Sequence, residues 1–425
     1  MGHVGVIEFS ERECTIRGMK SVIFVAPVAL EATQRFLRAA VRLHGARLSI
    51  IGQDGPERLS PEIARKLAAY ERIADCHDPA QLEQAVRAIQ NRTGQPCQVL
   101  LAILEPIQVP VAQVRERLGI PGMSVESALN FRDKSRMKDV LRAADLPCAR
   151  HRSCNSVNEV AQFAASTGFP IVVKPQAGAG AKNTHKVETR EQLDSLLRST
   201  PVTPQQPLYV EEFVQGDEFS FDSVSIAGRP VFHSISRYLP TPLHVLENPW
   251  IQWVVHLPLD ISGPDYAAIH RAGPQALEAL GVGTNLTHME WFRRRDGSIA
   301  ISEVAARPPG AQFTTLLSVA HGTDFYQAWV ELMVHGTFAA PTRSASVGCA
   351  YLRGQGSGRI QRVLGMDQIV RELGPLLYER HLPEIGAAPR DSYEGDGYII
   401  VRGPDSKTVE QALARVVETV RVELA

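Results

Sequence analysis

A lysine followed by a glycine-rich run is the first group of residues with recognisable chemistry. Lys174 ends the apolar segment 171–174, and the run Gln-Ala-Gly-Ala-Gly follows at 176–180. A lysine at a strand end can contact phosphate oxygens, while the N–H groups of a flexible loop, here at Gly178 and Gly180, cover them. The run lacks the Gly-Lys-Ser/Thr of a Walker A loop. On its own, Lys174 is explained more simply as an ordinary charged strand end.

An acidic segment with aromatic neighbours follows about thirty-five residues later, at 209–218. The backbone at the end of a strand can pair with the edge of an adenine ring, and a carboxylate such as Glu218 can accept hydrogen bonds from ribose hydroxyls. An exposed acidic hairpin explains the same residues equally well. The segment therefore needs support from its surroundings.

Two glutamates and an arginine form the third group. Glu290 and Glu303 lie on predicted strands joined by the Asp-Gly turn at 296–297, so antiparallel pairing should bring them close together. Two carboxylates on one sheet face repel each other unless a cation neutralises them, and Mg²⁺ bridging nucleotide phosphates is the usual solution. Arg307 follows with a planar fork for phosphate or carboxylate. Two solvent-facing glutamates are the alternative.

The elements that position these groups differ along the chain. The N-terminal part alternates apolar strands with amphipathic helices, which predicts a parallel sheet covered by helices on both faces. The strands are expected at 21–27, 48–52 and 99–104, with helices at 31–43 and 81–90. Because Gly-x-Gly-x-x-Gly is absent, we expect a Rossmann-like domain at 1–120 without a dinucleotide site. The same absence argues against an NAD-dependent oxidoreductase.

The rest of the chain predicts α+β structure with antiparallel hairpins. A helix is expected at 133–144, and strands at 171–174, 208–213, 218–226 and 299–304. Beyond Pro341, a strand at 398–401 and a helix at 409–422 predict a small C-terminal α+β domain. The expected organisation is thus an α/β and α+β multidomain chain, divided into 1–120, 121–205, 206–338 and 339–425.

Composition excludes several classes of function. The formal net charge of the 425 residues is -1, so no overall field attracts nucleic acid or an acidic membrane. The longest apolar run, 22–30, is too short to cross a bilayer. The six cysteines form no Cys-x-x-Cys pair, which argues against zinc and suits a reducing cytoplasm. No signal peptide is visible at the N-terminus, so a cytoplasmic location is expected.

The order of the three groups resembles that of the ATP-grasp superfamily. The resemblance rests on 130–134, 173–175, 211–213, Glu290 and 303–307, and it covers most of the chain. It implies bound ATP and Mg²⁺, with Mn²⁺ as a substitute. By resemblance, Lys134 and Lys174 would contact the phosphates, Glu211 with the backbone through Phe213 and Val214 would hold adenine, Glu218 would bind ribose, and Glu290 and Glu303 would hold the metal.

Within the superfamily the chain is most similar to L-amino acid ligases and carnosine-synthase-like enzymes, through 358–360, 390–392 and 397–400. This similarity implies a ligase that joins a small carboxylate to an amine through an acyl phosphate and releases ADP and phosphate. Lys174 and Arg307 would be catalytic, and His256, His288 and Gly310 would lie at the substrate site. Ala305 replaces the asparagine that many ATP-grasp enzymes use as a further metal ligand.

Other readings stay open at this stage. The chain could catalyse a different ATP-grasp reaction, such as a biotin-carboxylase-like carboxylation or a ligation in nucleotide or cofactor synthesis. It could also bind ATP without turnover, although intact Lys174, Glu290, Glu303 and Arg307 argue against decay of the site. The two substrates are not determined by the sequence, and a homodimer is compatible with the resemblance.

Overall fold

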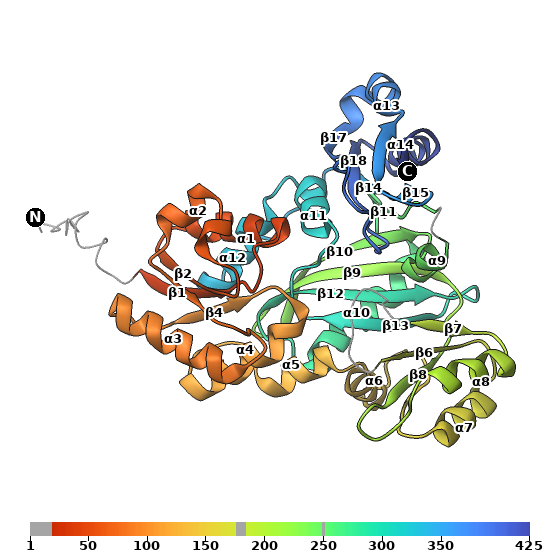
Figure 1. Ribbon diagram of the computed structural model, residues 1–425, viewed down its shortest axis with the longest axis horizontal. Helices are drawn as coiled ribbons and strands as arrows, with labels where there is room; N and C mark the ends of the chain where they lie inside the picture. Colours follow the sequence, from red (N-terminus) through yellow and green to blue (C-terminus); the bar gives the residue numbers. More distant parts are fainter. Residues whose placement is uncertain (1–18, 176–183, 249–250) are drawn as a thin grey trace, which may run out of the picture. The chain divides into compact units, whose positions relative to one another are not determined.

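The N-terminal compact unit is built on a parallel sheet. The computed structural model describes residues 19–175, 184–248 and 251–425. The chain divides into two compact units, each made of two stretches. Unit 1 comprises the chain up to Ser124 together with Val330–Thr337, and unit 2 comprises Val125–Trp329 and Phe338–Ala425. The sheet of unit 1 has the order β3-β2-β1-β4 with every pair parallel (Figure 1). This confirms the predicted Rossmann-like arrangement.

The strands and helices of unit 1 follow the predicted alternation closely. Their bounds are β1 Lys20–Val25, α1 Glu31–Arg42, β2 Ala46–Gly52, α2 Pro61–Lys66, β3 Ala69–Arg72, α3 Pro79–Thr93, β4 Val99–Ala102 and α4 Gln108–Leu118. Apolar side chains from β1, β4, α3 and α4 form one buried cluster, which explains why β1 and β4 are nearly continuous apolar runs. The second stretch of unit 1, Val330–Thr337, returns to this unit from later in the chain, and most of it belongs to helix α12, Phe325–His335.

Unit 2 contains a small antiparallel sheet of order β5-β8-β6-β7. Its strands are β5 His151–Cys154, β6 Ile171–Pro175, β7 His185–Val187 and β8 Leu208–Glu212. Figure 1 shows α7, Val157–Thr167, and α8, Arg190–Ser199, beside this sheet, and their apolar faces share its core. Strand β8 was expected at the start of a separate 206–338 subdomain, but it pairs with β5 and β6 and belongs here.

An eight-stranded antiparallel sheet forms the rest of the frame, in the order β13-β12-β9-β10-β11-β14-β18-β17. The strands are β9 Asp217–Ile226, β10 Arg229–Leu239, β11 Val254–Leu257, β12 Asn285–Arg293, β13 Ile299–Ala305, β14 Ser346–Leu352, β17 Leu377–His381 and β18 Gly397–Gly403. Strands β14, β18 and β17 belong to the C-terminal part of the chain and continue this sheet through β11.

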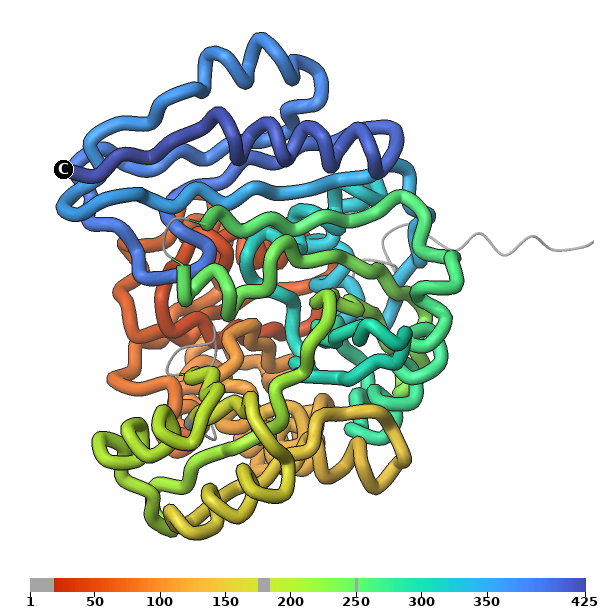
Figure 2. The backbone as a smooth tube through the Cα atoms, turned by 90° about the vertical axis from the view of Figure 1, so that its right-hand side faces the viewer, coloured from red at the N-terminus to blue at the C-terminus, as the bar shows by residue number. Residues whose placement is uncertain are grey.

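The C-terminal helix α14, Ser406–Thr419, packs on these last strands through an apolar core, and Figure 2 shows it in dark blue along them. The helix was predicted over 409–422, but it ends at Thr419, and Arg421–Leu424 forms β19. Strand β19 joins β15, Gly354–Gln355, and β16, Ile360–Leu364, in a three-stranded sheet.

The remaining helices of unit 2 are α5 Val125–Arg132, α6 Lys134–Ala143, α9 Pro242–Glu247, α10 Ala267–Leu280, α11 Phe313–His321 and α13 Met366–Leu373. Helix α6 begins where the Asp133 carboxylate accepts hydrogen bonds from the N–H groups of Ser135 and Arg136, at 2.9 and 3.1 Å. None of the helices in the described part of the chain combines the length and the apolar character of a membrane span.

Candidate active site

A large cavity lies within unit 2, at about 1160 Å³. Its walls come from α6, both antiparallel sheets, the start of α11 and the loop 390–394. Pockets for one drug-sized molecule span roughly 300–1,000 Å³, so this cavity can hold more than one small ligand. It gathers all three groups of residues that the sequence singled out.

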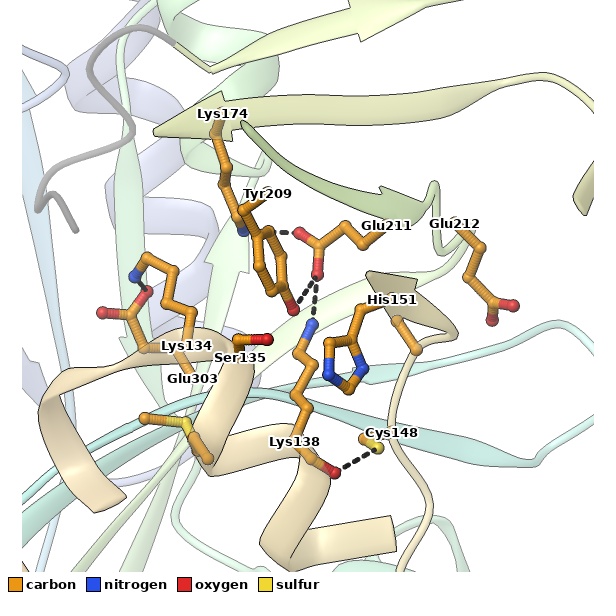
Figure 3. A network of polar contacts seen from close by, with 12 residues as sticks. Lys134, Ser135, Lys138, Cys148, His151, Lys174, Tyr209, Glu211, Glu212 and Glu303 are labelled. Carbon is orange, nitrogen blue, oxygen red and sulfur yellow. Dashed lines mark hydrogen bonds and ion pairs between the residues drawn. The ribbon is translucent and has the colours of Figure 1, made fainter. Parts of the chain in front are cut away.

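A buried carboxylate held by two lysines forms one wall (Figure 3). Glu211 on β8 makes ion pairs with Lys174 on β6 and with Lys138 on α6, and the Tyr209 hydroxyl donates to it at 3.3 Å. The side chains of Lys138 and Glu211 are only 1% and 8% exposed. Because β6 and β8 are adjacent, and Lys138 lies one turn after Lys134 on α6, the fold delivers three lysines to one region.

The charges in this wall stabilise one another. Burial alone raises the pKa of the Glu211 carboxyl, but Lys138 and Lys174 outweigh it and hold that pKa well below its usual range. Burial lowers the pKa of Lys138, which Glu211 only partly offsets. For Lys174 the balance is reversed, because Glu211, Glu303 and Glu290 together raise its pKa above the usual value despite burial. Lys174 is therefore a fixed positive charge facing the cavity.

The paired glutamates are cross-strand neighbours, as the turn predicted. Glu290 on β12 stands opposite Glu303 on β13. The tight turn between these strands is held by Asp296, whose carboxylate accepts from the N–H and the hydroxyl of Ser298 at 2.9 and 2.7 Å. Glu303 makes an ion pair with Lys134, which is 9% exposed. The sequence thus fixed this juxtaposition through a local hairpin.

The donor set suits a magnesium ion shared with phosphates. Within the described residues, no three His, Cys, Asp or Glu side chains converge as a ready metal cluster. Mg²⁺ commonly binds through one or two carboxylates plus substrate phosphates and water, rather than in an all-protein cage. Glu290 and Glu303 therefore fit such an ion, and Ala305 opposite His288 supplies no further oxygen from its side chain.

A charged histidine lies beside this pair. His288 Nδ1 is 2.6 Å from Asp222 Oδ1, and its Nε2 is 3.2 Å from the Tyr238 hydroxyl and 3.7 Å from Glu290 Oε1. Burial lowers the pKa of His288, but Asp222 and Glu290 overcome this and raise it to about 9. Both ring nitrogens are engaged by the protein, so the imidazolium balances the nearby carboxylates.

Arg307 and Gly310 line the cavity just beyond β13. The Arg307 guanidinium donates to the Pro308 carbonyl at 2.9 Å. Ala311 and Gln312 follow with φ values of 44° and 60°, a left-handed conformation that is uncommon for residues other than glycine. The hydroxyl of Tyr351 donates to the Ala311 carbonyl and holds this segment. Such constrained backbone is frequent at ligand sites.

Residues 139–322 match the family model described as the ATP-grasp domain. This chain carries an ATP-grasp domain. It is 22% identical over 253 residues to the L-arginine-specific L-amino acid ligase of Bacillus subtilis, covering 55% of this chain and 60% of that enzyme. It thus spans less than two thirds of the length of that relative.

Solved structures share the fold across nearly the whole chain. The L-amino acid ligase from Bacillus licheniformis superposes with a TM-score of 0.74 at 18% identity, covering 96% of this chain and 99% of that one. N5-carboxyaminoimidazole ribonucleotide synthetase from Thermotoga maritima gives a TM-score of 0.70 at 16% identity, covering 96% and 100%. At these identities the likeness concerns the fold alone.

The cavity contains most of the residues that the sequence singled out. Its lining includes Lys134, Lys174, Glu211, Phe213, Val214, Glu218, His288, Glu290, Glu303, Arg307 and Gly310. Glu211 differs from its expected role in one respect, because its carboxylate is committed to two lysines. Gly178 and Gly180 lie outside the described residues. Burial and then the charge of Glu290 raise the pKa of Glu218 well above its usual value.

His256 is not brought to the cavity. It is fully buried on β11, with Nε2 2.8 Å from the Ser346 hydroxyl of the neighbouring strand β14. Its ring therefore contributes to packing between strands, and the expected substrate contact is not formed. Burial, followed by the charges of Arg237 and Arg343, lowers the pKa of His256 to about 4.

The sequence analysis did not identify one lysine and four aromatic residues that line the cavity. The missed cavity residues are Lys138, Tyr238, Trp253, Phe313 and Tyr393. The spacing of Lys138, four residues after Lys134, was a usable signal for a shared helix face. The aromatic residues come from four separate segments, and no local pattern announces their meeting.

Proposed function

We propose that this chain is an ATP- and Mg²⁺-dependent ligase that joins a carboxylate to an amine between two small substrates, amino acids in particular. The observation that carries the proposal is the presence of three lysines, a carboxylate pair and Arg307 on the walls of one cavity with room for more than one ligand. The named activity of the L-amino acid ligase relative supports the choice of substrates.

Bound Mg-ATP would supply the phosphoryl group that activates the substrate carboxylate as an acyl phosphate, with release of ADP and, after attack by the amine, phosphate. The chain's own residues would contribute position and charge. Lys174, fixed by Glu211, and Lys134, beside Glu303, present ammonium groups where phosphate oxygens would lie. Glu290 and Glu303 would hold the metal. Stabilisation of the developing negative charge, to which the ammonium groups of the lysines would contribute, is the main catalytic effect expected of such a site.

Arg307 would act on the substrate side. Its planar guanidinium can bind a carboxylate or the oxygens of a transferring phosphoryl group. The two prolines that follow it limit the backbone conformations available to the segment, so the side chain is presented from a constrained position. Because the activated group is made on the substrate, no protein nucleophile is required.

Product analysis tests this proposal. The enzyme would be incubated with ATP, Mg²⁺ and amino acids taken two at a time, with ADP, phosphate and ligated product measured by chromatography and mass spectrometry. We expect ADP and phosphate in equal amounts and an amide product. Formation of AMP and pyrophosphate would exclude an acyl phosphate.

Bicarbonate should be tested in place of the substrate carboxylate, because the fold is shared with a carboxyaminoimidazole ribonucleotide synthetase. ADP release that depends on bicarbonate and on no amine would replace the ligase with another ATP-grasp reaction. A Lys174→Met variant serves as the control for contaminating ATPase activity, since it removes a phosphate-facing charge while keeping a side chain of similar length.

A further inference from the structure

Two arginines from segments far apart in the chain line the same cavity. Arg307 follows β13, and Arg390 lies in the loop 390–394 between β17 and β18. Both act on one half-buried carboxyl, that of Glu394. Burial raises the pKa of Glu394, and the charges of Arg390 and then Arg307 lower it only in part. The two guanidinium groups are therefore gathered at one end of the cavity.

The loop that carries Arg390 is held against the cavity wall. The Arg390 N–H donates to Asp396 Oδ1 at 2.9 Å, and the Asp396 N–H donates to the Leu352 carbonyl on β14 at 2.9 Å. Between them, the Tyr393 ring stands edge-on to the Trp253 ring, with the centroids 4.7 Å apart. Because these contacts fix the backbone of the loop, the Arg390 side chain enters the cavity from a defined position.

The charge of Arg390 is not neutralised by the side chains around it. No side chain in the described part of the chain forms an ion pair with Arg390. Burial lowers the pKa of Arg353, and the charges of Asp391 and Asp396 oppose this, so the two carboxylates of the loop act on Arg353. A carboxyl in a close ion pair has a lowered pKa, whereas that of Glu394 is raised. The Arg390 guanidinium is thus available to an anionic ligand.

A ligase for two amino acids has two substrate carboxylates to accommodate. One is activated beside Glu290 and Glu303, and the other, on the amine substrate, has to stay unreacted. Arg307 lies four residues after Glu303 and so belongs to the reacting end, whereas Arg390 comes from a separate loop. A guanidinium binds a carboxylate through two parallel hydrogen bonds and thereby orients it. Arg390 is the cation of the cavity that suits the unreacted carboxylate.

We propose that Arg390 is a specificity-determining residue that binds the carboxylate of the amine substrate. The enzyme therefore selects amino acids as amines and discriminates against amines that lack a carboxylate. The inference rests on the proposed function, because it assigns a role within the same site.

A competition between an amino acid and its amide tests this role. L-alanine and L-alaninamide have similar size and share the ammonium group, but the amide lacks the carboxylate and can react only as the amine. The full chain would be given ATP, Mg²⁺ and equal amounts of both, and mass spectrometry would measure the ratio of alanyl-alanine to alanyl-alaninamide. We expect the free dipeptide to dominate. Arg390→Met should shift the ratio about 10-fold toward the amide, as expected for the loss of a hydrogen-bonded charge.

Arg390→Lys should keep part of the preference, because lysine retains the charge but not the planar fork. Arg380→Met is the matched control, since Arg380 is exposed on β17 and does not line the cavity, and it should leave the product ratio unchanged. The ratio is internal to each reaction, so a general loss of activity through misfolding does not alter it. The same experiment would be repeated with L-arginine and L-argininamide.

Titration calorimetry separates this inference from the ligase itself. With ADP and Mg²⁺ present, each amino acid should bind more tightly than its amide, and Arg390→Met should reduce that difference while ADP affinity stays the same. An unchanged product ratio or binding preference in Arg390→Met would overturn the role of Arg390, as would the absence of binding by either amino acid. A loss of ADP affinity alone would assign Arg390 to the nucleotide instead. A chain that binds amino acids through Arg390 but forms no amide keeps the carboxylate site and refutes the ligase.

Discussion

Replacing Lys138 by methionine probes the buried charges beside the nucleotide end of the cavity. The substitution preserves the length of the side chain but removes one of the two ammonium groups that hold Glu211. Removing one partner of a buried ion pair costs about 3–5 kcal/mol. Glu211 keeps Lys174 and the Tyr209 hydroxyl, so we expect a loss near the lower end, about 3 kcal/mol.

Glu211→Gln should cost more, about 5 kcal/mol, because it leaves two buried lysines without a carboxylate. In the double variant Lys138→Met/Glu211→Gln, only one lysine, Lys174, is left without its carboxylate partner. Its loss of stability should therefore be smaller than the sum of the two single losses, which identifies the residues as one interacting group.

Urea unfolding followed by tryptophan fluorescence measures these losses. The chain has four tryptophans, at positions 250, 253, 291 and 329, and the three in the described residues belong to unit 2. The signal therefore reports on the unit that contains the buried charges. Lys186→Met is the control, because Lys186 pairs with an exposed partner, Glu188, at the surface, and such pairs contribute about 0–1 kcal/mol. A Lys138→Met variant no less stable than this control would refute the reasoning.

Three further predictions concern catalysis and pH. Glu303→Gln should lower turnover at least about 100-fold and shift its dependence on Mg²⁺ to higher Mg²⁺ concentration, measured by phosphate release. An unchanged Mg²⁺ dependence would show that Glu303 is not a ligand. Arg307→Ala should lower kcat about 10²- to 10³-fold with nearly unchanged ATP affinity by calorimetry, and equal losses in both would assign Arg307 to the nucleotide. The pKa of His256, lowered to about 4 from 6.5 by burial and then by two arginines, means that the unfolded chain takes up a proton first. The free energy of unfolding should therefore fall as pH drops from about 6.5 to 4, by up to about 1.4 kcal/mol per pH unit. Midpoints of urea unfolding measured at several pH values should fall less steeply in His256→Gln. The control His244→Gln, at an exposed position, should keep the full fall.

The sequence predicted the parts of the site that local geometry controls. Glu290 and Glu303 flank one tight turn, so their pairing follows from the hairpin itself, and the structure places them opposite each other. Lys174 and Glu211 were recognised as separate signals, but their ion pair depends on β6 lying beside β8. That adjacency joins segments 37 residues apart, and only the sheet order supplies it.

Burial was the property that sequence patterns missed. A lysine on a helix is usually exposed, so the sequence suggests a surface position for Lys138. Its side chain is only 1% exposed, because Glu211 on strand β8 balances its charge. For His256 the error was the opposite one, because the resemblance to L-amino acid ligases implied a substrate contact, while the strand pairing places the residue in the core. The end of α14 was misplaced because the alternation of Val422 and Leu424 with polar residues belongs to β19 and not to the helix.

Unit 1 is discontinuous in the chain, and this affects how it can be made. Lys20 donates to the Val334 carbonyl at 2.6 Å, and His335 Nε2 lies 3.1 Å from the His44 carbonyl, so the returning segment Val330–Thr337 is part of the unit. Ribosomes add about 5–20 residues per second, and the 205 intervening residues (329 − 124 = 205) therefore require about 10–40 s. During that interval the nascent chain holds a first unit that lacks its last piece, so its completion must follow the synthesis of most of unit 2.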